Sequence, residues 1–307
     1  MIGTWASSVW KRPSAGVLAV GIVLAPVLAA TTVEPPPERP ARPVEVTDTA
    51  RGRAFAVEAA ERAVAAGTSI AADDFAVWEV GGRLVAGPPG AVPDVQPVRG
   101  PNGADGERVS VAEPIVDGTR PAAEQQAVAV EAAGWHLVGS SCWIEERRDG
   151  DAWIDVCYHK HRATSDGSSR YDYYALKLFA TAGLDGCCWY ELGDQWIEAA
   201  RNGGDPQRWH DWSPRSDASV GSCTSVNLSV RVNGYGLSAP FTQCETWDIT
   251  KYAAAGRFRN RWKEGFCMQV RGEREVAFNI ASRVAQGSVP YWKFTWFNGR
   301  DWAGCTS

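Results

Sequence analysis

The placement of the cysteines constrains this chain more than any other feature. All 8 Cys lie in residues 135–307, and two of them lie at equal distances from a predicted turn. The Asp-Gly pair at 149–150 is a strong hairpin signal, because both central residues of such a turn need a positive φ. In this register Cys142 faces Cys157 at a Cα separation of about 5 Å, which suits a disulfide. The sequence therefore predicts a disulfide-bridged hairpin.

A second hairpin follows from the same reasoning. The Asn-Gly pair at 233–234 is again a turn signal, and Cys223 and Cys244 lie at equal distances from it. Apolar residues alternate along 226–232, so they share one face of a half-buried strand. Pro240 has to lie on an unpaired edge of this hairpin. We expect a second bridge, Cys223–Cys244.

The four remaining cysteines are Cys187, Cys188, Cys267 and Cys305. Because a bond between adjacent cysteines is strained, we expect Cys187 and Cys188 to bond separately to the other two, in either order. An even number of cysteines is typical of disulfides in a secreted chain. The sequence contains no CxxC pair, which argues against a zinc–thiolate site.

Short segments with alternating apolar residues and β-rich composition follow one another through residues 135–307. The further candidate strands are 171–181, 188–198, 257–263, 275–284 and 291–297. Many strands with frequent turns and few helices are typical of a sandwich. We therefore expect a mainly β fold: a disulfide-bridged antiparallel β-sandwich, preceded by a small, loosely structured α/β N-terminal segment.

Residues 1–30 are typical of a secretory signal peptide. Lys11 and Arg12 precede an apolar run that ends in small residues. The run of about 15 residues is shorter than the roughly 20 that cross a bilayer, although an uncleaved anchor is the alternative. We expect a secreted or cell-surface protein with no transmembrane span in the mature chain.

Two segments separate this signal from the cysteine-rich domain. Residues 31–47 form a Pro-rich linker, and residues 48–134 form an acidic, Cys-free segment. Within it, the pattern predicts helices at 54–66 and 121–133, a hairpin at 75–85 and a loop at 86–106. The segment could be a spacer, a propeptide or a small domain, and we favour a spacer that packs loosely against the domain of residues 135–307.

Charge favours some partners over others. The net charge of −5 argues against nucleic acid as a partner. One segment nevertheless concentrates positive charge on one face of a predicted strand, through Arg257, Arg259, Arg261 and Lys263. This pattern is typical of an edge strand protected by charge, and alternatively of a stripe that binds an anionic polymer.

Tryptophan is abundant, with 15 residues in the chain. The candidate ligand-binding aromatics are Trp189, Trp196, Trp209 and Trp212. The last two lie in 201–219, which we interpret as a long polar loop. Tryptophans in a loop either pack against the core or bind something, such as a sugar ring.

The sequence offers little for metal binding or catalysis. His159 and His161 lie on one face of a predicted strand and could share a metal ion, but the motif is weak and the chain has only 4 His. No nucleophile-elbow motif is present. The acids near Trp189 and Trp196, where a hydrolase site would be sought, are Asp185, Glu191, Asp194 and Glu198. We expect no cofactor.

These observations favour an exported, non-catalytic binding protein of the cell envelope or extracellular space. Its partner would be a glycan, an anionic envelope polymer or another extracellular protein. One alternative is a secreted hydrolase that acts on carbohydrate or peptide, and another is a structural envelope protein with no small ligand. The sequence leaves the ligand and the oligomeric state open.

Overall fold

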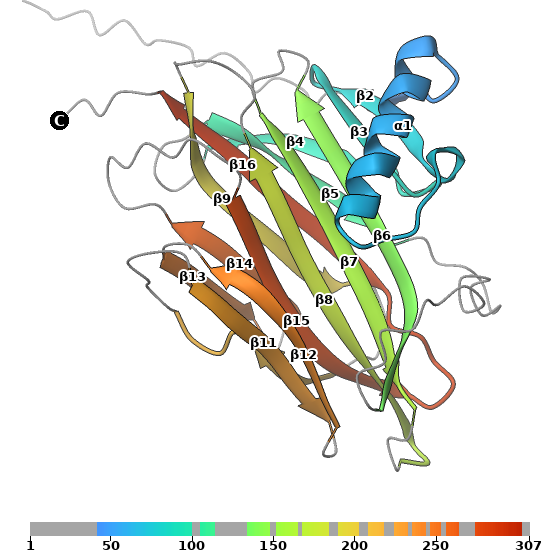
Figure 1. Ribbon diagram of the computed structural model, residues 1–307, viewed down its shortest axis with the longest axis vertical. Coiled ribbons are helices and arrows are strands. Elements are labelled where there is room, and N and C mark those ends of the chain that lie inside the picture. Colours follow the sequence, from blue (N-terminus) through green and yellow to red (C-terminus); the bar gives the residue numbers. More distant parts are fainter. Residues whose placement is uncertain are drawn as a thin grey trace, which may run out of the picture. The chain divides into compact units, whose positions relative to one another are not determined.

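Two antiparallel sheets pack face to face in the computed structural model, so the chain is a β-sandwich as predicted (Figure 1). The structure describes residues 42–99, 105–113, 134–147, 152–164, 168–183, 190–202, 208–217, 224–232, 235–243, 246–252, 256–263 and 274–302. The predicted signal peptide, the helix at 121–133, and the cysteines other than Cys142 and Cys157 lie outside these residues.

The first sheet has eight strands. In spatial order they are β1 (Val44–Glu45), β2 (Ala76–Val80), β3 (Arg83–Gly87), β6 (Trp135–Arg147), β7 (Trp153–Ala163), β8 (Tyr171–Gly183), β15 (Arg274–Ala285) and β10 (Arg208–Ser213). The turn between β2 and β3 is the predicted one, and Gly81 and Gly82 both have positive φ there.

The second sheet has six strands. In spatial order they are β13 (Thr246–Tyr252), β14 (Arg257–Lys263), β9 (Tyr190–Arg201), β16 (Trp292–Trp302), β5 (Asp105–Ala112) and β4 (Asp94–Arg99). A separate two-stranded sheet consists of β11 (Thr224–Val232) and β12 (Tyr235–Gln243). Among the described residues, the helical elements are α1 (Ala50–Ala65) and the 3₁₀ turn η1 (Ala72–Asp74).

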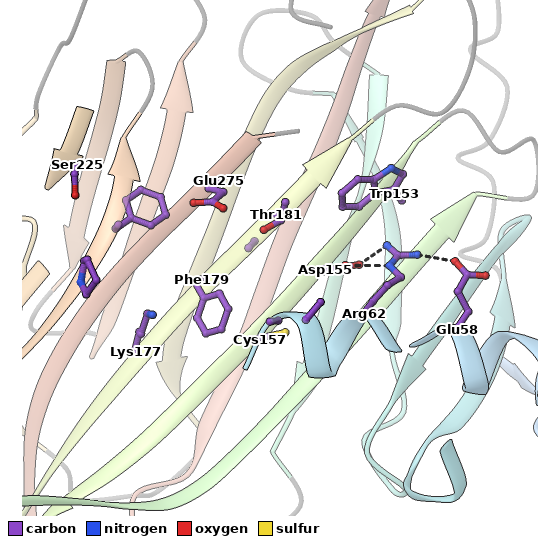
Figure 2. A pocket seen from close by; sticks show the side chains of 15 residues that line it. Glu58, Arg62, Trp153, Asp155, Cys157, Lys177, Phe179, Thr181, Ser225 and Glu275 are labelled. Carbon is purple, nitrogen blue, oxygen red and sulfur yellow. Dashed lines mark hydrogen bonds and ion pairs between the residues drawn. The ribbon is translucent and has the colours of Figure 1, made fainter. Parts of the chain in front are cut away.

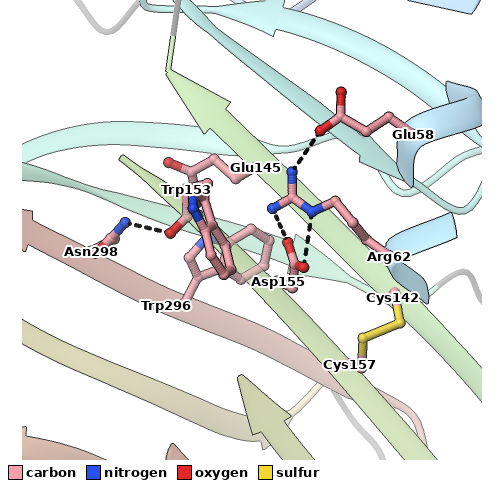
Figure 3. Close-up of polar contacts among 9 residues, drawn as sticks. All are labelled: Glu58, Arg62, Cys142, Glu145, Trp153, Asp155, Cys157, Trp296 and Asn298. Atoms are coloured by element: carbon pink, nitrogen blue, oxygen red, sulfur yellow. Dashed lines mark hydrogen bonds and ion pairs between the residues drawn. A yellow bond between two sulfur atoms is a disulfide. The ribbon is translucent and has the colours of Figure 1, made fainter. Parts of the chain in front are cut away.

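The main core lies between the two large sheets. Trp143 of β6 lies 5.0 Å from Phe294 and 6.2 Å from Trp296, both of β16, between ring centroids. The ion pair between Arg83 and Glu145 is buried at this core, and Trp296 Nε1 donates to Glu145 Oε2 at 2.6 Å. Figure 3 shows Glu145 beside Trp296. The buried carboxylate therefore has partners from both sheets.

The predicted disulfide between Cys142 and Cys157 is present. The two residues are direct partners in the β6–β7 ladder, at a Cα separation of 4.1 Å. The opposite face of this hairpin lies in the core, because Trp143 and Val156 are fully buried there. The register argument is confirmed, although its turn residues lie outside the described ranges.

The second predicted register is also confirmed. Val232 pairs with Tyr235 and Thr224 pairs with Gln243, as an Asn-Gly turn at 233–234 requires. Pro240 pairs with Asn227 and its side chain is exposed. Continuing this register would bring Cys223 opposite Cys244, but both residues lie outside the described part of the chain, so that bridge stays a prediction.

Helix α1 covers one end of the outer face of the eight-stranded sheet. It begins four residues earlier than predicted, because the Thr49 side chain caps it by accepting from Gly52 N at 2.9 Å. Its buried face is made of Phe55 and small residues, which pack beside Cys142 and Cys157. Small residues let the helix backbone lie close to the sheet.

The β11–β12 hairpin covers another part of the same outer face. Its alternating apolar residues, including Leu228, Val230 and Phe241, are buried against β8 and β15. It forms its own sheet, and side chains supply two polar contacts. Asn279 Nδ2 donates to Leu228 O at 2.8 Å, and Arg231 N donates to Asp211 Oδ2 at 2.8 Å.

The N-terminal segment is more closely integrated than expected. Its strands β2 and β3 join the eight-stranded sheet next to β6, whereas β4 and β5 join the six-stranded sheet next to β16. Residues Arg39–Ser307 form one unit. The loop expected at 86–106 is wrong, because that stretch contains β4. Backbone pairing with distant strands stabilises segments that carry few large apolar residues.

Candidate functional site

A groove of about 760 Å³ opens on the outer face of the eight-stranded sheet, between α1 and the β11–β12 hairpin (Figure 2). The floor is formed by β7, β8 and β15. The walls are α1 and the β11–β12 hairpin, the two coverings of this face of the sheet. The lining includes Arg62 from α1, Trp153 and Asp155 from β7, Lys177, Phe179 and Thr181 from β8, Ser225 from β11 and Glu275 from β15. The volume is typical of a small-molecule or oligomer site.

The helix wall is tied to the floor by an ion pair. Arg62 Nε donates to Asp155 Oδ2 at 3.0 Å, and a second guanidinium nitrogen contacts the other oxygen of Asp155 (Figure 3). Glu58 contacts the same guanidinium at 3.2 Å. Burial alone would lower the pKa of Arg62, but the hydrogen bond and charge of Asp155 outweigh it and raise that pKa above its ordinary value.

Trp153 forms an aromatic surface next to this ion pair. Its indole lies across Gly183 of the neighbouring strand, where an added Cβ would come within 2.4 Å of the ring. Asn298 Nδ2 donates to the Trp153 carbonyl at 3.1 Å and so fixes the backbone. The Arg62 guanidinium lies 4.9 Å from the ring centroid. Gly183 and Arg62 therefore hold the ring in place, and Asn298 holds the backbone that carries it.

Lys177 and Phe179 form the middle of the floor. Lys177 Nζ lies 4.6 Å from the Phe179 ring centroid. Desolvation lowers the pKa of Lys177, and the charge of Glu275 opposes that shift. Within the described part of the chain, no carboxylate lies within ion-pairing distance of this ammonium group.

The two histidines that the sequence offers as a weak metal candidate lie next to the floor, on the same face of the sheet. The rings of His159 and His161 lie 6.3 Å apart and edge to face, and His159 lies 5.3 Å from Phe179. Burial lowers the pKa of each to about 4, and the charge of Lys177 adds to the shift. No group of three or more His, Cys, Asp or Glu within the described residues is arranged to hold a metal ion.

The predicted tryptophan platform is not a loop. Residues 208–213 form the edge strand β10, whose ladder with β15 has a bulge between Trp209 and Asp211. In a regular strand, two residues that are three apart point to opposite faces. The bulge adds one residue, so Trp209 and Trp212 both pack against the sandwich core. They are partly buried, and the loop interpretation of 201–219 is wrong for this stretch.

The other predicted aromatics lie elsewhere. Trp196 is almost fully buried on the six-stranded sheet and stacks on Phe297 at 6.0 Å. Trp189 lies outside the described residues, and so does Asp185. Of the acids beside them, Glu198 is described and is engaged with two arginines. Nothing brings Trp196 into contact with Trp209 or with the groove.

The predicted basic strand is β14, with Phe258 in the core as expected. It pairs with both β13 and β9, so the interpretation of an edge strand is wrong. Arg259 binds Glu198 at 2.8 Å and lies 3.8 Å from the Trp196 ring centroid, and Arg257 lies 3.6 Å from the same carboxylate. Arg261 is partly buried, and the side chain of Lys263 lies outside the described residues. Glu198 therefore neutralises part of the charge that the sequence places on this strand.

Sequence reasoning missed the groove. Its floor residues Lys177, Phe179 and Thr181 alternate along a correctly predicted strand, which was the available signal. The local sequence does not predict that α1 and a hairpin from the second half of the domain lie on either side of that strand. The shared face of His159 and His161 on the neighbouring strand was predicted.

Among the described residues, no helix combines the length and apolarity that a bilayer-spanning helix needs. No protein-family model matches this chain, and a search of curated proteins finds no match. Among solved structures, one neighbour is named "Pore forming protein". It is 8% identical, with a TM-score of 0.28, and the alignment covers 69% of this chain and 92% of the neighbour. A likeness at that TM-score carries no argument about function, so the proposals below stand on the groove.

Proposed function

We propose that this chain is an exported, non-catalytic binding protein of the cell envelope or the extracellular space, and that it holds a glycan in the groove between α1 and the β11–β12 hairpin. The lining of the groove carries the proposal: aromatic side chains, among them Trp153 and Phe179, lie among carboxylates and hydroxyls. The C–H faces of sugar rings pack on aromatic rings, and sugar hydroxyls need donors and acceptors of this kind.

Binding is favoured over catalysis by the state of the reactive groups. The sulfur of Cys157 is in a disulfide, and Asp155 accepts hydrogen bonds from Arg62. A carboxylate held in an ion pair is a poor general acid, because the charged form is stabilised. These groups are thus suited to shaping the groove.

Export is supported by two observations. The first 30 residues have the pattern of a signal peptide. The Cys142–Cys157 bridge is a bond that persists in oxidising compartments. Intact-mass measurement of exported protein tests this part, and retention of Met1 in the mature chain would contradict it.

A groove-filling variant tests the binding site. Thr181 lies in the floor, opposite Asp155 of β7 and Glu275 of β15. We expect Thr181→Trp to weaken binding to cell-envelope polysaccharide at least about tenfold by occupying the groove. The matched control is Ser238→Trp, which adds the same indole at an exposed position of β12.

Affinity electrophoresis in gels cast with the polysaccharide gives the readout, and thermal melting confirms that both variants fold. Equal retardation of the two variants would place the ligand elsewhere. Release of new reducing ends from the polysaccharide by the unmodified protein would favour the hydrolase instead.

A further inference from the structure

The charged groups of the groove differ in their partners. Arg62 is engaged by Asp155 and Glu58, so its positive charge is largely satisfied within the protein. Lys177 has no such partner among the described residues, although it lies on the floor of the same groove. A desolvated cation without a counter-ion is unfavourable unless a ligand supplies the opposite charge. Lys177 is therefore the group that an incoming ligand would satisfy.

We propose that the glycan bound in this groove carries carboxylate groups, as a uronic acid chain does, and that Lys177 binds one of them. This inference rests on the proposed function and adds the ligand's charge. Lys177 Nζ stands beside the face of Phe179, so a sugar ring near that aromatic would bring its carboxylate to the ammonium group. Thr181 and Ser225 offer hydroxyls on the same groove lining.

The surroundings of Lys177 favour a carboxylate over a phosphate monoester. Glu58, Asp155 and Glu275 also line the groove, and they would repel the dianionic monoester more than a singly charged carboxylate. Phosphate sites usually present arginine forks or several backbone N–H groups, and the one arginine in this lining is already paired. A single ammonium group with hydroxyls nearby suits a single negative charge.

Calorimetry with defined oligosaccharides tests the proposal. The probes are oligogalacturonate, the same oligomer after its carboxyl groups are reduced to alcohols, and a glycerol-phosphate polymer. We expect Lys177→Met to weaken oligogalacturonate binding about ten- to a hundredfold, as for loss of a charged hydrogen bond. The reduced oligomer should bind unmodified protein and Lys177→Met within about twofold of each other.

Two further variants keep the result interpretable. Lys293→Met removes the same charge from an exposed position on β16 of the other sheet and should leave every affinity unchanged. Glu275→Gln removes a repelling charge near Lys177 and should strengthen oligogalacturonate binding a few-fold. Melting temperatures identify any variant that fails to fold, and the opposite effects expected of Lys177→Met and Glu275→Gln cannot both arise from unfolding.

The outcomes separate this inference from the function it rests on. Equal binding of oligogalacturonate by the unmodified protein and Lys177→Met would overturn the role of Lys177. Equal binding of the native and the reduced oligomer would overturn the preference for carboxylates while leaving a glycan site. Tighter binding of the glycerol-phosphate polymer would replace carboxylate by phosphate. No difference between Thr181→Trp and Ser238→Trp on any bound glycan would remove the groove as the binding site.

Discussion

Helix α1 and the β11–β12 hairpin cover the same face of the eight-stranded sheet, but different interactions hold them there. The helix packs on the sheet through a small apolar surface, and the Arg62–Asp155 ion pair and a disulfide lie next to that surface. The hairpin has a larger row of apolar side chains, and its backbone accepts a hydrogen bond from Asn279 and donates one to Asp211. The difference indicates that charge and pH act mainly on the helix wall of the groove, whereas packing defects act mainly on the hairpin wall.

A cavity under the hairpin should have the largest effect. Leu228 is 2% exposed and packs on Phe241 and Ala277, so Leu228→Ala should lower the free energy of unfolding by about 2–5 kcal/mol. The neighbouring Asn227→Ala, at an exposed position of the same strand, should change it by less than about 0.5 kcal/mol. Urea denaturation measures both. Equal effects of the two would mean that the apolar face does not hold the hairpin.

Removing the ion pair should have an intermediate effect, confined to the helix wall. Arg62→Gln leaves the partly buried Asp155 without its guanidinium partner, so we expect a loss of about 1–3 kcal/mol. Arg53→Gln, on an exposed position of the same helix, is the control. Hydrogen exchange should show faster exchange in α1 and no change in β11–β12. Faster exchange in both coverings would mean that they are coupled through the groove.

The two coverings also show what the sequence could and could not predict. The hairpin could be predicted because a turn dipeptide, alternating apolar residues and equidistant cysteines all lie within a short stretch. Each of these features indicates the same register. The bulge that turns Trp209 and Trp212 to one face has no such local signal. A bulge depends on the partner strand, so the two tryptophans were interpreted as loop residues.

The groove was beyond local reasoning for a related reason. Its lining comes from six elements that are spread along the chain, and the helix among them belongs to a segment interpreted as a spacer. The strand pattern placed Lys177 and Phe179 on one face, but their environment depends on what stands beside that face. Backbone pairing of β2 and β3 with β6 brings α1 to the groove, and such long-range pairing leaves no motif in the sequence.

Acid should act on the helix wall. The folded pKa of His159 and of His161 is about 4, below the ordinary value of 6.5, because both rings are poorly solvated. The unfolded chain therefore binds more protons between pH 6.5 and 4. Stability from the neutral rings is complete above pH 6.5 and is lost as the pH falls toward 4.

The charged and titratable groups around these rings determine which part of the protein loses stability in acid. Lys177 faces His159 from β8 and disfavours its protonation, and His136 of β6 has the same effect on His161. From the helix side, the backbone of Gly67 favours the charged form of His159 and limits the shift. His159 therefore lies between Lys177, on the floor of the groove, and the turn that follows α1.

His159→Gln should flatten the dependence of unfolding free energy on pH between 6.5 and 4, because it removes one of the two shifted groups. His210→Gln, at an exposed position on β10, is the matched control and should leave the slope unchanged. Hydrogen exchange at pH 7 and pH 4.5 locates the effect: protection of the last turn of α1 should fall relative to that of β11–β12. If protection of the hairpin falls more than that of the helix, acid acts on the other wall, and the contrast between the two coverings does not hold for protonation.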